Sequence, residues 1–206
     1  MRITSGNARG ISLNSPRGDS TRPATDAARQ AIFSSLGSAI IGSKVLDIFA
    51  GTGAYGLEAA SRGAASVLFV ESDRRALEAL RINVAAVGKA LRSAGETPSM
   101  RIAGADCFKL LRGVGEAFDF VFLDPPYAML EDEKSLDRIL EMLCGIASDS
   151  ATFILEAPAQ FGLPREFSAF NSAGGLKKFG FKEINRLGKK SKGKPSQIVF
   201  GICEIG

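Results

Sequence analysis

The chain has 206 residues, of which 45% are hydrophobic and 23% charged, and its net charge is +4. These values indicate one folded domain with a small extension, and they exclude collagen, coiled coil and general disorder as descriptions of the chain. Three cysteines and no histidine argue against a disulfide framework and a zinc site, and they exclude a histidine general base. No apolar run reaches the roughly 20 residues of a membrane span, and a secretory signal is missing, so we expect a cytoplasmic protein without membrane or metal partners.

The first part of the chain predicts a hairpin and then a helix. Residues 2–13 have the pattern of a short hairpin that turns near Gly6–Gly10. After a polar loop, Thr25 or Asp26 can cap a helix that ends at Leu36. The apolar face of this helix would consist of Ala28, Ile32, Phe33 and Leu36.

From Lys44 onward, short apolar strands alternate with helices. This alternation predicts right-handed β-α-β crossovers and a Rossmann-like α/β fold with a mostly parallel, seven-stranded sheet. The last two strands predict an antiparallel C-terminal hairpin at the sheet edge. We expect residues 1–40, the hairpin and the first helix, to form an N-terminal extension and residues 41–206 to form the main domain. The predicted strands are Val45–Phe49, Ser66–Glu71, Met100–Ala103, Phe118–Leu123, Ala151–Leu155, Phe179–Leu187 and Gln197–Cys203; the predicted helices are Ala54–Arg62, Asp73–Val87 and Glu131–Ile146, with Gly88–Ser99 as a loose polar connection.

A buried strand runs into a glycine-rich turn, and a helix follows directly. Gly51, Gly53 and Gly56 spell G-x-G-x-x-G, in which the missing Cβ atoms permit a tight turn and the close approach of a ligand. Glu71 ends the next strand, about 20 residues later, where a carboxylate can accept hydrogen bonds from ribose hydroxyls. This arrangement predicts a nucleotide-type cofactor site, and the alternative is a turn that binds nothing.

Two classes of cofactor use this arrangement. A dinucleotide places its pyrophosphate at the helix N-terminus, whereas S-adenosylmethionine (SAM) places an ammonium group near the loop. Asp47, four residues before Gly51, supplies a carboxylate that attracts an ammonium and repels a pyrophosphate. We therefore favour SAM and keep a nicotinamide-dependent oxidoreductase as a rival. Asp106, after the third strand, can accept from an adenine amino group or cap a helix, and the two roles are compatible.

A fourth buried strand ends in the segment Asp124-Pro-Pro-Tyr127. Ligands of open α/β sheets bind outside the carboxyl ends of the strands, so we expect this segment to face the same crevice as Gly51–Gly53. The Asp124 carboxylate and the Pro125 carbonyl can accept both hydrogens of an exocyclic amino group and orient its lone pair toward a methyl donor. Asp124 can also stabilise the developing positive charge, and Tyr127 can stack on the base. The alternative is a proline-rich turn that only ends a strand.

These motifs resemble those of a known family. Asp47–Gly53 followed by Asp124–Tyr127 is similar to the class I SAM-dependent methyltransferases that act on amino groups. More narrowly, the chain resembles the RsmD family, bacterial enzymes that methylate guanine N2 at one position of 16S ribosomal RNA (rRNA). The narrower resemblance is carried by Arg2-Ile, Gly6, Arg9-Gly10, Leu13, Arg22-Pro-Ala-Thr-Asp26, Arg29 and Phe33, and by the run from Asp47 to Ala64.

The resemblance implies a class I methyltransferase fold, SAM as the cofactor, and methylation of a flipped guanine of the guanine-966 type. The family usually has Thr and Glu where this chain has Ala24 and Gln30. The catalytic residues that the resemblance implies are Asp124, Pro125, Pro126 and Tyr127, and the cofactor-binding residues are Asp47, Phe49, Gly51, Thr52, Gly53, Glu71, Ser72, Asp106 and Cys107.

The two ends of the chain are basic. Residues 1–44 hold six basic and two acidic residues, residues 177–206 hold eight and two, and the part between them is acidic. Such segregation suggests an anionic partner, although a merely solvated surface is the alternative. With the resemblance, residues 1–40 are expected to be an RNA-facing extension and residues 41–206 the SAM-dependent methyltransferase domain. The expected partner is 16S rRNA or an assembling small ribosomal subunit, bound by a monomer. The expected RNA contacts are Arg2, Arg9, Arg22, Arg29, Lys189, Lys190, Lys192 and Lys194.

Two other functions remain open from the sequence. An amino methyltransferase of this kind could act on DNA adenine or on a protein glutamine instead of RNA. A non-catalytic RNA-binding module could also keep the fold of an enzyme, although the intact Asp124-Pro-Pro-Tyr127 segment argues against it.

Overall fold

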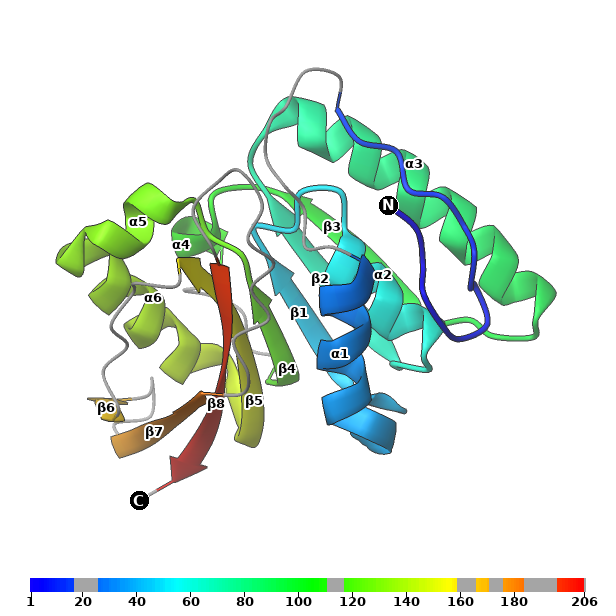
Figure 1. Cartoon of the computed structure of the whole chain (residues 1–206). Helices are drawn as coiled ribbons and strands as arrows, with labels where there is room; N and C mark the ends of the chain where they lie inside the picture. Colours follow the sequence, from blue (N-terminus) through cyan, green and yellow to red (C-terminus); the bar gives the residue numbers. More distant parts are fainter. Residues whose placement is uncertain (17–25, 111–116, 159–165, 171–175, 184–195, 206) are drawn as a thin grey trace. The chain divides into compact units, whose positions relative to one another are not determined.

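The computed structural model describes residues 1–16, 26–110, 117–158, 166–170, 176–183 and 196–205. The chain divides into two compact units, Met1–Asp106 and Cys107–Gly206, which are described separately. Figure 1 labels their helices and strands. None of the helices in the described ranges combines the length and the apolar character that a membrane crossing requires. The predicted boundary at residue 40 falls within the first unit, and the RNA-facing role of the extension stays a prediction.

The strands of the first unit form a parallel sheet in the order β3-β2-β1. Their bounds are Lys44–Ile48 for β1, Ser66–Glu71 for β2 and Ser99–Gly104 for β3. The register pairs Ile48 with Val70 and Val70 with Ala103, so the carboxyl ends of all three strands meet at one edge. The residues predicted to bind the cofactor in this unit lie at these strand ends or directly after them.

Two helices follow the first two strands. Helix α2 (Ala54–Ser61) is buried along its whole length, and α3 (Arg74–Ser93) buries one apolar face. The predicted end of α3 at Val87 is wrong, because the helix continues through Gly88 for almost two further turns. Gly88 is buried, and a Cβ built on it would lie 3.1 Å from the Met100 methyl carbon, so close packing accounts for a glycine inside the helix.

The N-terminal segment, which we define as residues 1–16, forms the predicted hairpin. An antiparallel bridge pairs Arg2 with Ser12, and the Ile3 N–H donates to the Ile11 carbonyl at 2.9 Å. Helix α1 (Asp26–Leu36) begins and ends as predicted. Its buried residues are Ile32 and Phe33, as expected, together with Arg29.

The second unit combines parallel and antiparallel pairing. Strands β4 (Phe118–Leu123) and β5 (Ala147–Pro158) are parallel, as predicted. Strand β8 (Ser196–Ile205) pairs antiparallel with β5, and β7 (Leu176–Glu183) pairs antiparallel with β8, which confirms the C-terminal antiparallel strands. Strand β6 (Glu166–Phe170), antiparallel to β7, was not predicted, so the described ranges hold one strand more than expected.

Three helices lie in the second unit, and two boundaries differ from the prediction. They are α4 (Cys107–Leu110), α5 (Tyr127–Glu131) and α6 (Glu133–Ile146). Helix α6 begins later than predicted because the Asp132 carboxylate caps it, accepting from the Ser135 N–H at 3.0 Å and hydroxyl at 2.6 Å. Strand β5 begins before the predicted Ala151, and an irregular register against β4, between Phe118 and Phe120, accommodates the additional residues.

Candidate functional site

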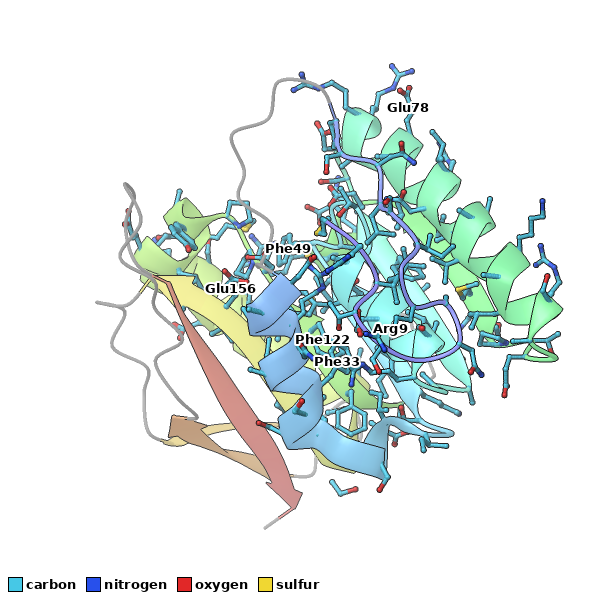
Figure 2. The ribbon with its side chains drawn as sticks, turned by 45° about the vertical axis from the view of Figure 1, so that its right-hand side comes forward. Arg9, Phe33, Phe49, Glu78, Phe122 and Glu156 are labelled. Atoms are coloured by element: carbon cyan, nitrogen blue, oxygen red, sulfur yellow. The ribbon has the colours of Figure 1, made fainter. Side chains whose placement is uncertain are left out.

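The loop between β1 and α2, which we call the cofactor loop (Phe49–Gly53), turns through left-handed conformations. The φ angles are 60° at Phe49, 55° at Gly51 and 80° at Gly53. A left-handed conformation at a residue other than glycine costs on the order of 1–2 kcal/mol and is found preferentially at functional sites. The Gly53 N–H donates to the Ala50 carbonyl at 2.7 Å and closes the turn. Phe49, the residue after β1, is labelled in Figure 2.

Two glycines of this region are required for different reasons. A Cβ on Gly53 would lie 2.5 Å from Leu80 Cδ1, so a side chain would clash with α3 as well as strain the turn. A Cβ on Gly51 would have only the Phe49 carbonyl oxygen, at 4.0 Å, among its described neighbours. The loop is therefore packed on the α3 side at Gly53 and open at Gly51, as a site for a closely approaching ligand requires.

Asp47 lies on β1 and is almost completely buried, with 2% of its surface exposed. Its Oδ2 accepts a hydrogen bond from the Gly56 N–H in the first turn of α2, at 2.9 Å. Burial, together with the nearby Glu71 carboxylate, raises the pKa of Asp47 to about 8, although the bond from Gly56 opposes the shift. A buried carboxyl that is held largely protonated at neutral pH can gain a negative charge when a cationic group binds beside it.

Glu71, at the end of β2, holds the cofactor loop. Its Oε2 accepts from the Gly51 N–H at 2.7 Å, and its Oε1 accepts from the N–H groups of Ser72 and Asp73 at 2.7 and 2.8 Å. A carboxylate offers about four acceptor positions, so three backbone donors leave room for about one further hydroxyl rather than the two ribose hydroxyls expected. Besides its predicted contact with the cofactor, Glu71 therefore also holds the backbone of the cofactor loop, a role that the sequence did not indicate.

The other predicted cofactor residues of the first unit lie at the same sheet edge. Thr52 is buried within the cofactor loop, and Ser72 is exposed after β2. Asp106 is exposed two residues after β3, whose Gly104 is in register with Glu71. All of these residues lie near neighbouring strand ends of one sheet: Asp47 and Glu71 in the last two residues of their strands, and the cofactor loop and Asp106 after them. Cys107 is buried at the start of α4, in the second unit.

The Asp124–Tyr127 segment directly follows β4 in the second unit. Asp124 and Tyr127 are half-buried, Pro125 is buried and Pro126 is exposed. Pro126 precedes α5, and its carbonyl accepts from the Met129 N–H at 2.8 Å, which closes the first turn of that helix. The carbonyl that we expect to accept a hydrogen bond from the target amino group is that of Pro125, one residue before Pro126.

A second acidic residue lies next to this strand end. Leu123 is in register with Leu155 on β5, so Asp124 and Glu156 both follow paired residues at the same edge of the sheet of the second unit. Glu156 is buried and is labelled in Figure 2. Glu156 is not among the residues predicted from the sequence, although an acid directly after the apolar run Phe153–Leu155 is the same signal that indicates Asp124.

The RNA-contact predictions have different outcomes in the structure. Arg2 and Arg9 are exposed on the N-terminal segment, where Figure 2 labels Arg9. Arg29 requires a correction, because its side chain is fully buried and donates to the Arg2 carbonyl at 2.6 Å and to Asp26 Oδ1 at 2.7 Å. We therefore assign Arg29 a structural role in place of RNA contact. The predictions for Arg22, Lys189, Lys190, Lys192 and Lys194 fall outside the described residues.

A buried carboxylate on α2, that of Glu58, anchors the N-terminal segment. It accepts from the Thr4 N–H at 2.8 Å, the Thr4 hydroxyl at 2.7 Å and the Ser5 N–H at 3.1 Å, and it pairs with Arg62 Nε at 2.8 Å. One turn away, the Ser61 hydroxyl donates to the Ser5 carbonyl at 2.6 Å. Glu58 is not among the residues predicted from the sequence, although a single acid inside an otherwise apolar helix is a recognisable signal.

The site fits a cationic, hydroxyl-bearing cofactor better than a metal or a dinucleotide. Among the described residues, no cluster of three or more potential ligand side chains could hold a metal ion. Asp47 supplies a buried carboxyl for an ammonium, Gly51 leaves space beside the loop, and Glu71 has acceptor capacity for a hydroxyl. A pyrophosphate would meet the Glu71 carboxylate, which repels it, and an anion beside the buried Asp47 would oppose ionisation of that carboxyl.

Comparisons with known proteins identify the relatives of this chain. The family model described as conserved hypothetical protein 95 matches residues 1–184. The chain is 33% identical over 164 residues to ribosomal RNA small subunit methyltransferase D of Escherichia coli K12, which covers 80% of this chain and 78% of the relative. It is 34% identical over 146 residues to the Bacillus subtilis protein YlbH, covering 69% of this chain and 73% of that relative.

Solved structures support the same relationship. A hypothetical protein of Thermus thermophilus matches with a TM-score of 0.71 and 26% identity, over 100% of this chain and 99% of that chain. Other structural neighbours are methyltransferases. The α/β fold predicted from the sequence is therefore confirmed as the class I methyltransferase fold.

Proposed function

The chain belongs to the RsmD family of small-subunit rRNA methyltransferases, and we propose that it methylates the exocyclic N2 amino group of a guanine in 16S rRNA, of the guanine-966 type, with SAM as its cofactor. The observation that carries the proposal is the pair of motifs at strand ends: the cofactor loop beside the buried Asp47, and Asp124-Pro-Pro-Tyr127 after β4. The first suits a cationic cofactor, and the second suits an amino group.

The cofactor would bind at the carboxyl edge of the first unit's sheet. Asp47 would attract the ammonium of the methionine part, and its pKa would fall as the cation approaches. The backbone of Gly51–Gly53 would line the same part of the ligand, Glu71 would accept from the ribose, and Asp106 would accept from the adenine amino group. SAM, when bound, supplies an activated methyl group.

The Asp124–Tyr127 segment would hold the flipped guanine. The Asp124 carboxylate and the Pro125 carbonyl accept the two hydrogens of the N2 amino group, which withdraws the nitrogen lone pair from the ring and points it at the methyl carbon. As the new N–C bond forms and the S–CH3 bond of SAM breaks, with S-adenosylhomocysteine as the leaving group, Asp124 would stabilise the positive charge on nitrogen, accept the proton that the nitrogen releases and pass it to water. Tyr127 stacks on the base, a contact worth about 1–3 kcal/mol.

The N-terminal segment would contact the phosphate backbone of the RNA. Arg2 and Arg9 carry exposed cations on it. Hydrogen bonds between this segment and the side chains of Glu58 and Ser61 hold its backbone on α2. A cation on a firmly held backbone loses less conformational freedom when it binds a phosphate than one on a flexible loop. Each such contact would add to the salt dependence of RNA binding.

Transfer of a labelled methyl group tests the proposed reaction. The protein is incubated with methyl-labelled SAM and, separately, with 16S rRNA transcript, small subunits from cells lacking this activity, duplex DNA and ribosomal protein. Label on one guanine N2 of the rRNA, mapped by mass spectrometry, supports the proposal. Label on DNA adenine or protein glutamine, or no turnover on any RNA form despite SAM binding, contradicts it.

A pair of variants on one strand tests the role of Asp124. Asp124→Asn removes the carboxylate charge that the reaction needs, so the rate of methyl transfer should fall about 10²- to 10⁴-fold with SAM affinity unchanged. Asp119→Asn, an equal change on the same strand β4 but away from its carboxyl end, is the matched control and should change the rate by less than about threefold. Equal activity of the two folded variants would contradict the assignment.

A further inference from the structure

A single buried amide, that of Asn83, joins the N-terminal segment to the cofactor loop. Asn83 lies on α3, is fully buried, and its Nδ2 donates to the Thr52 carbonyl at 2.9 Å and to the Asn14 carbonyl at 3.0 Å. Its Oδ1 accepts from the Asn14 N–H at 2.8 Å and from Asn14 Nδ2 at 3.3 Å. Figures 1 and 2 both show the N-terminal segment running alongside α3.

Asn83 is a polar residue on the buried face of a helix, so its side chain depends on these hydrogen bonds. It shares the buried face of α3 with Leu80 and Val87, where an apolar residue would be expected from the helical pattern. A buried amide is tolerated there because its donors and its acceptor are all satisfied, and removal of a partner leaves buried polar groups without hydrogen bonds. The partners come from two segments that the sequence separates by almost 40 residues, and one of them, Thr52, belongs to the cofactor loop.

We propose that Asn83 is a positioning residue that makes the conformation of the cofactor loop depend on the N-terminal segment, so that SAM binding and RNA binding strengthen each other. This inference rests on the proposed function, which places SAM at the loop and RNA at the N-terminal segment. RNA bound to residues 1–16 would further stabilise the Asn14 backbone that is hydrogen-bonded to the Asn83 amide, and the amide holds the Thr52 carbonyl in the orientation that the loop needs.

The coupling must be reciprocal, because both ligands act on one hydrogen-bonded unit. If RNA raises the affinity for the cofactor by some factor, the cofactor raises the affinity for RNA by the same factor. Couplings of this kind are typically about 5- to 150-fold. The second anchor of the N-terminal segment, at Glu58 and Ser61, makes no hydrogen bond to the cofactor loop among those described, so Asn83 carries the proposed link.

Calorimetric titration with S-adenosylhomocysteine, with and without 16S rRNA transcript, tests the proposal on full-length protein. Asn83→Leu removes the amide and keeps a side chain of similar size, and Val87→Ala, one turn along the buried face of α3, is the destabilised control. We expect both to lower the melting temperature, but only Asn83→Leu to weaken S-adenosylhomocysteine binding, by about tenfold, and to lose the increase in affinity on adding RNA. Unchanged affinity, or equal weakening in the control, would overturn the inference.

Hydrogen exchange on the unmodified protein gives a test that does not depend on the folding of a variant. The Asn14 amide is bonded to Asn83 Oδ1, so its exchange reports directly on the proposed link. Saturation with S-adenosylhomocysteine should slow this exchange about tenfold, whereas a purely structural Asn83 predicts no change. If S-adenosylhomocysteine binds and the Asn14 amide is unaffected, this inference alone fails; if it does not bind at all, the proposed function fails as well.

Discussion

The Gly51 backbone N–H donates a hydrogen bond to Glu71 Oε2, with 2.7 Å between nitrogen and oxygen. This bond joins the loop after β1 to the end of β2, two parallel strands whose pairing brings Ile48 opposite Val70. The same carboxylate also accepts from the first two N–H groups after β2. Glu71 thus shapes the cofactor loop through its bonds to three backbone N–H groups, and a ligand hydroxyl would complete an acceptor that these bonds orient.

Glu71→Gln should weaken cofactor binding more than it weakens the fold. The amide can no longer accept from all three backbone N–H groups, and hydrogen bonds to a charged acceptor are worth about 1.5–3 kcal/mol. We expect the dissociation constant of S-adenosylhomocysteine to rise about 10- to 100-fold by calorimetry. The protein should keep its circular dichroism spectrum.

The neighbouring acid Asp73 provides the control for that experiment. Its Oδ1 caps α3 by accepting from the Ala76 N–H at 2.9 Å, and it makes no described bond to the cofactor loop. Asp73→Ala should cost about 1 kcal/mol of stability, as the loss of an N-cap usually does, and should leave S-adenosylhomocysteine affinity within about twofold. A similar loss of affinity in both variants would show that the effect comes from general destabilisation of this turn.

Asp47→Asn should stabilise the protein while reducing its function. The pKa of Asp47 is raised from 3.8 to about 8, first by burial, so between these pH values the folded protein holds a proton that the unfolded chain has released. Stability attributable to Asp47 therefore falls as the pH rises from about 4 to about 8. Asparagine cannot ionise and can still accept from the Gly56 N–H. Urea unfolding at pH 5, 7 and 9 should show a gain of about 1–2 kcal/mol at neutral pH that grows with pH up to about 8, and a gain independent of pH would contradict this explanation.

The same carboxyl should couple cofactor binding to proton release. A cationic ammonium beside Asp47 favours the carboxylate, so S-adenosylhomocysteine binding below pH 8 should release up to one proton. Affinity should then rise about tenfold per pH unit between pH 6 and pH 8 and level off above. Calorimetry in phosphate and in Tris, buffers with different ionisation enthalpies, measures the proton directly. The Asp47→Asn variant should show no difference between the buffers.

The sequence predicted most strands and the cofactor loop because those features are local. An apolar run that ends in glycines, or in Asp124-Pro-Pro-Tyr127, can be recognised within about ten residues. Glycine at 88 was read as a helix end because its close packing against Met100 involves a residue on another element. Arg29 was read as an RNA contact because the pattern of charge does not show that its guanidinium is buried against Asp26.

The polar anchors were missed for the same physical reason. Glu58 and Asn83 hold partners more than 50 residues away in the chain, Thr4 for the first and Asn14 for the second. Each occupies the buried side of a helix, so the available signal was a polar residue at a position where the helical pattern calls for an apolar one. That signal indicates a buried hydrogen-bonding group, but it does not identify its partner.

Gly6→Ala should destabilise the N-terminal segment far more than Gly10→Ala. Both glycines have left-handed φ angles, 78° and 87°, so each alanine carries the same backbone cost of about 1–2 kcal/mol. Only at Gly6 would the new Cβ collide with another element, since it would lie 1.8 Å from the Ser61 carbonyl oxygen. No described atom lies within 4 Å of the corresponding position at Gly10. Urea unfolding should show at least about 2 kcal/mol of additional loss for Gly6→Ala, and equal losses would contradict the packing of the segment on α2.

Arg9 and Arg29 should respond in opposite ways when each is replaced by alanine. Arg9→Ala removes an exposed cation, so RNA affinity should fall and the slope of log K against log salt should decrease by about 0.7–0.9, the value for one lost phosphate contact, with little change in stability. Arg29→Ala removes a fully buried guanidinium that holds Asp26 and the Arg2 carbonyl, so the free energy of unfolding should fall by about 2 kcal/mol or more. The hydrogen bond from Arg29 also lowers the pKa of Asp26, although burial raises it, so the stability that this pair contributes should be lost as the pH falls below about 4.

Filter binding to 16S rRNA transcript at several salt concentrations, with urea unfolding of the same variants, measures the effects on RNA affinity and on stability. A salt slope that changes in folded Arg29→Ala but not in Arg9→Ala would restore Arg29 as the RNA contact and contradict its structural role.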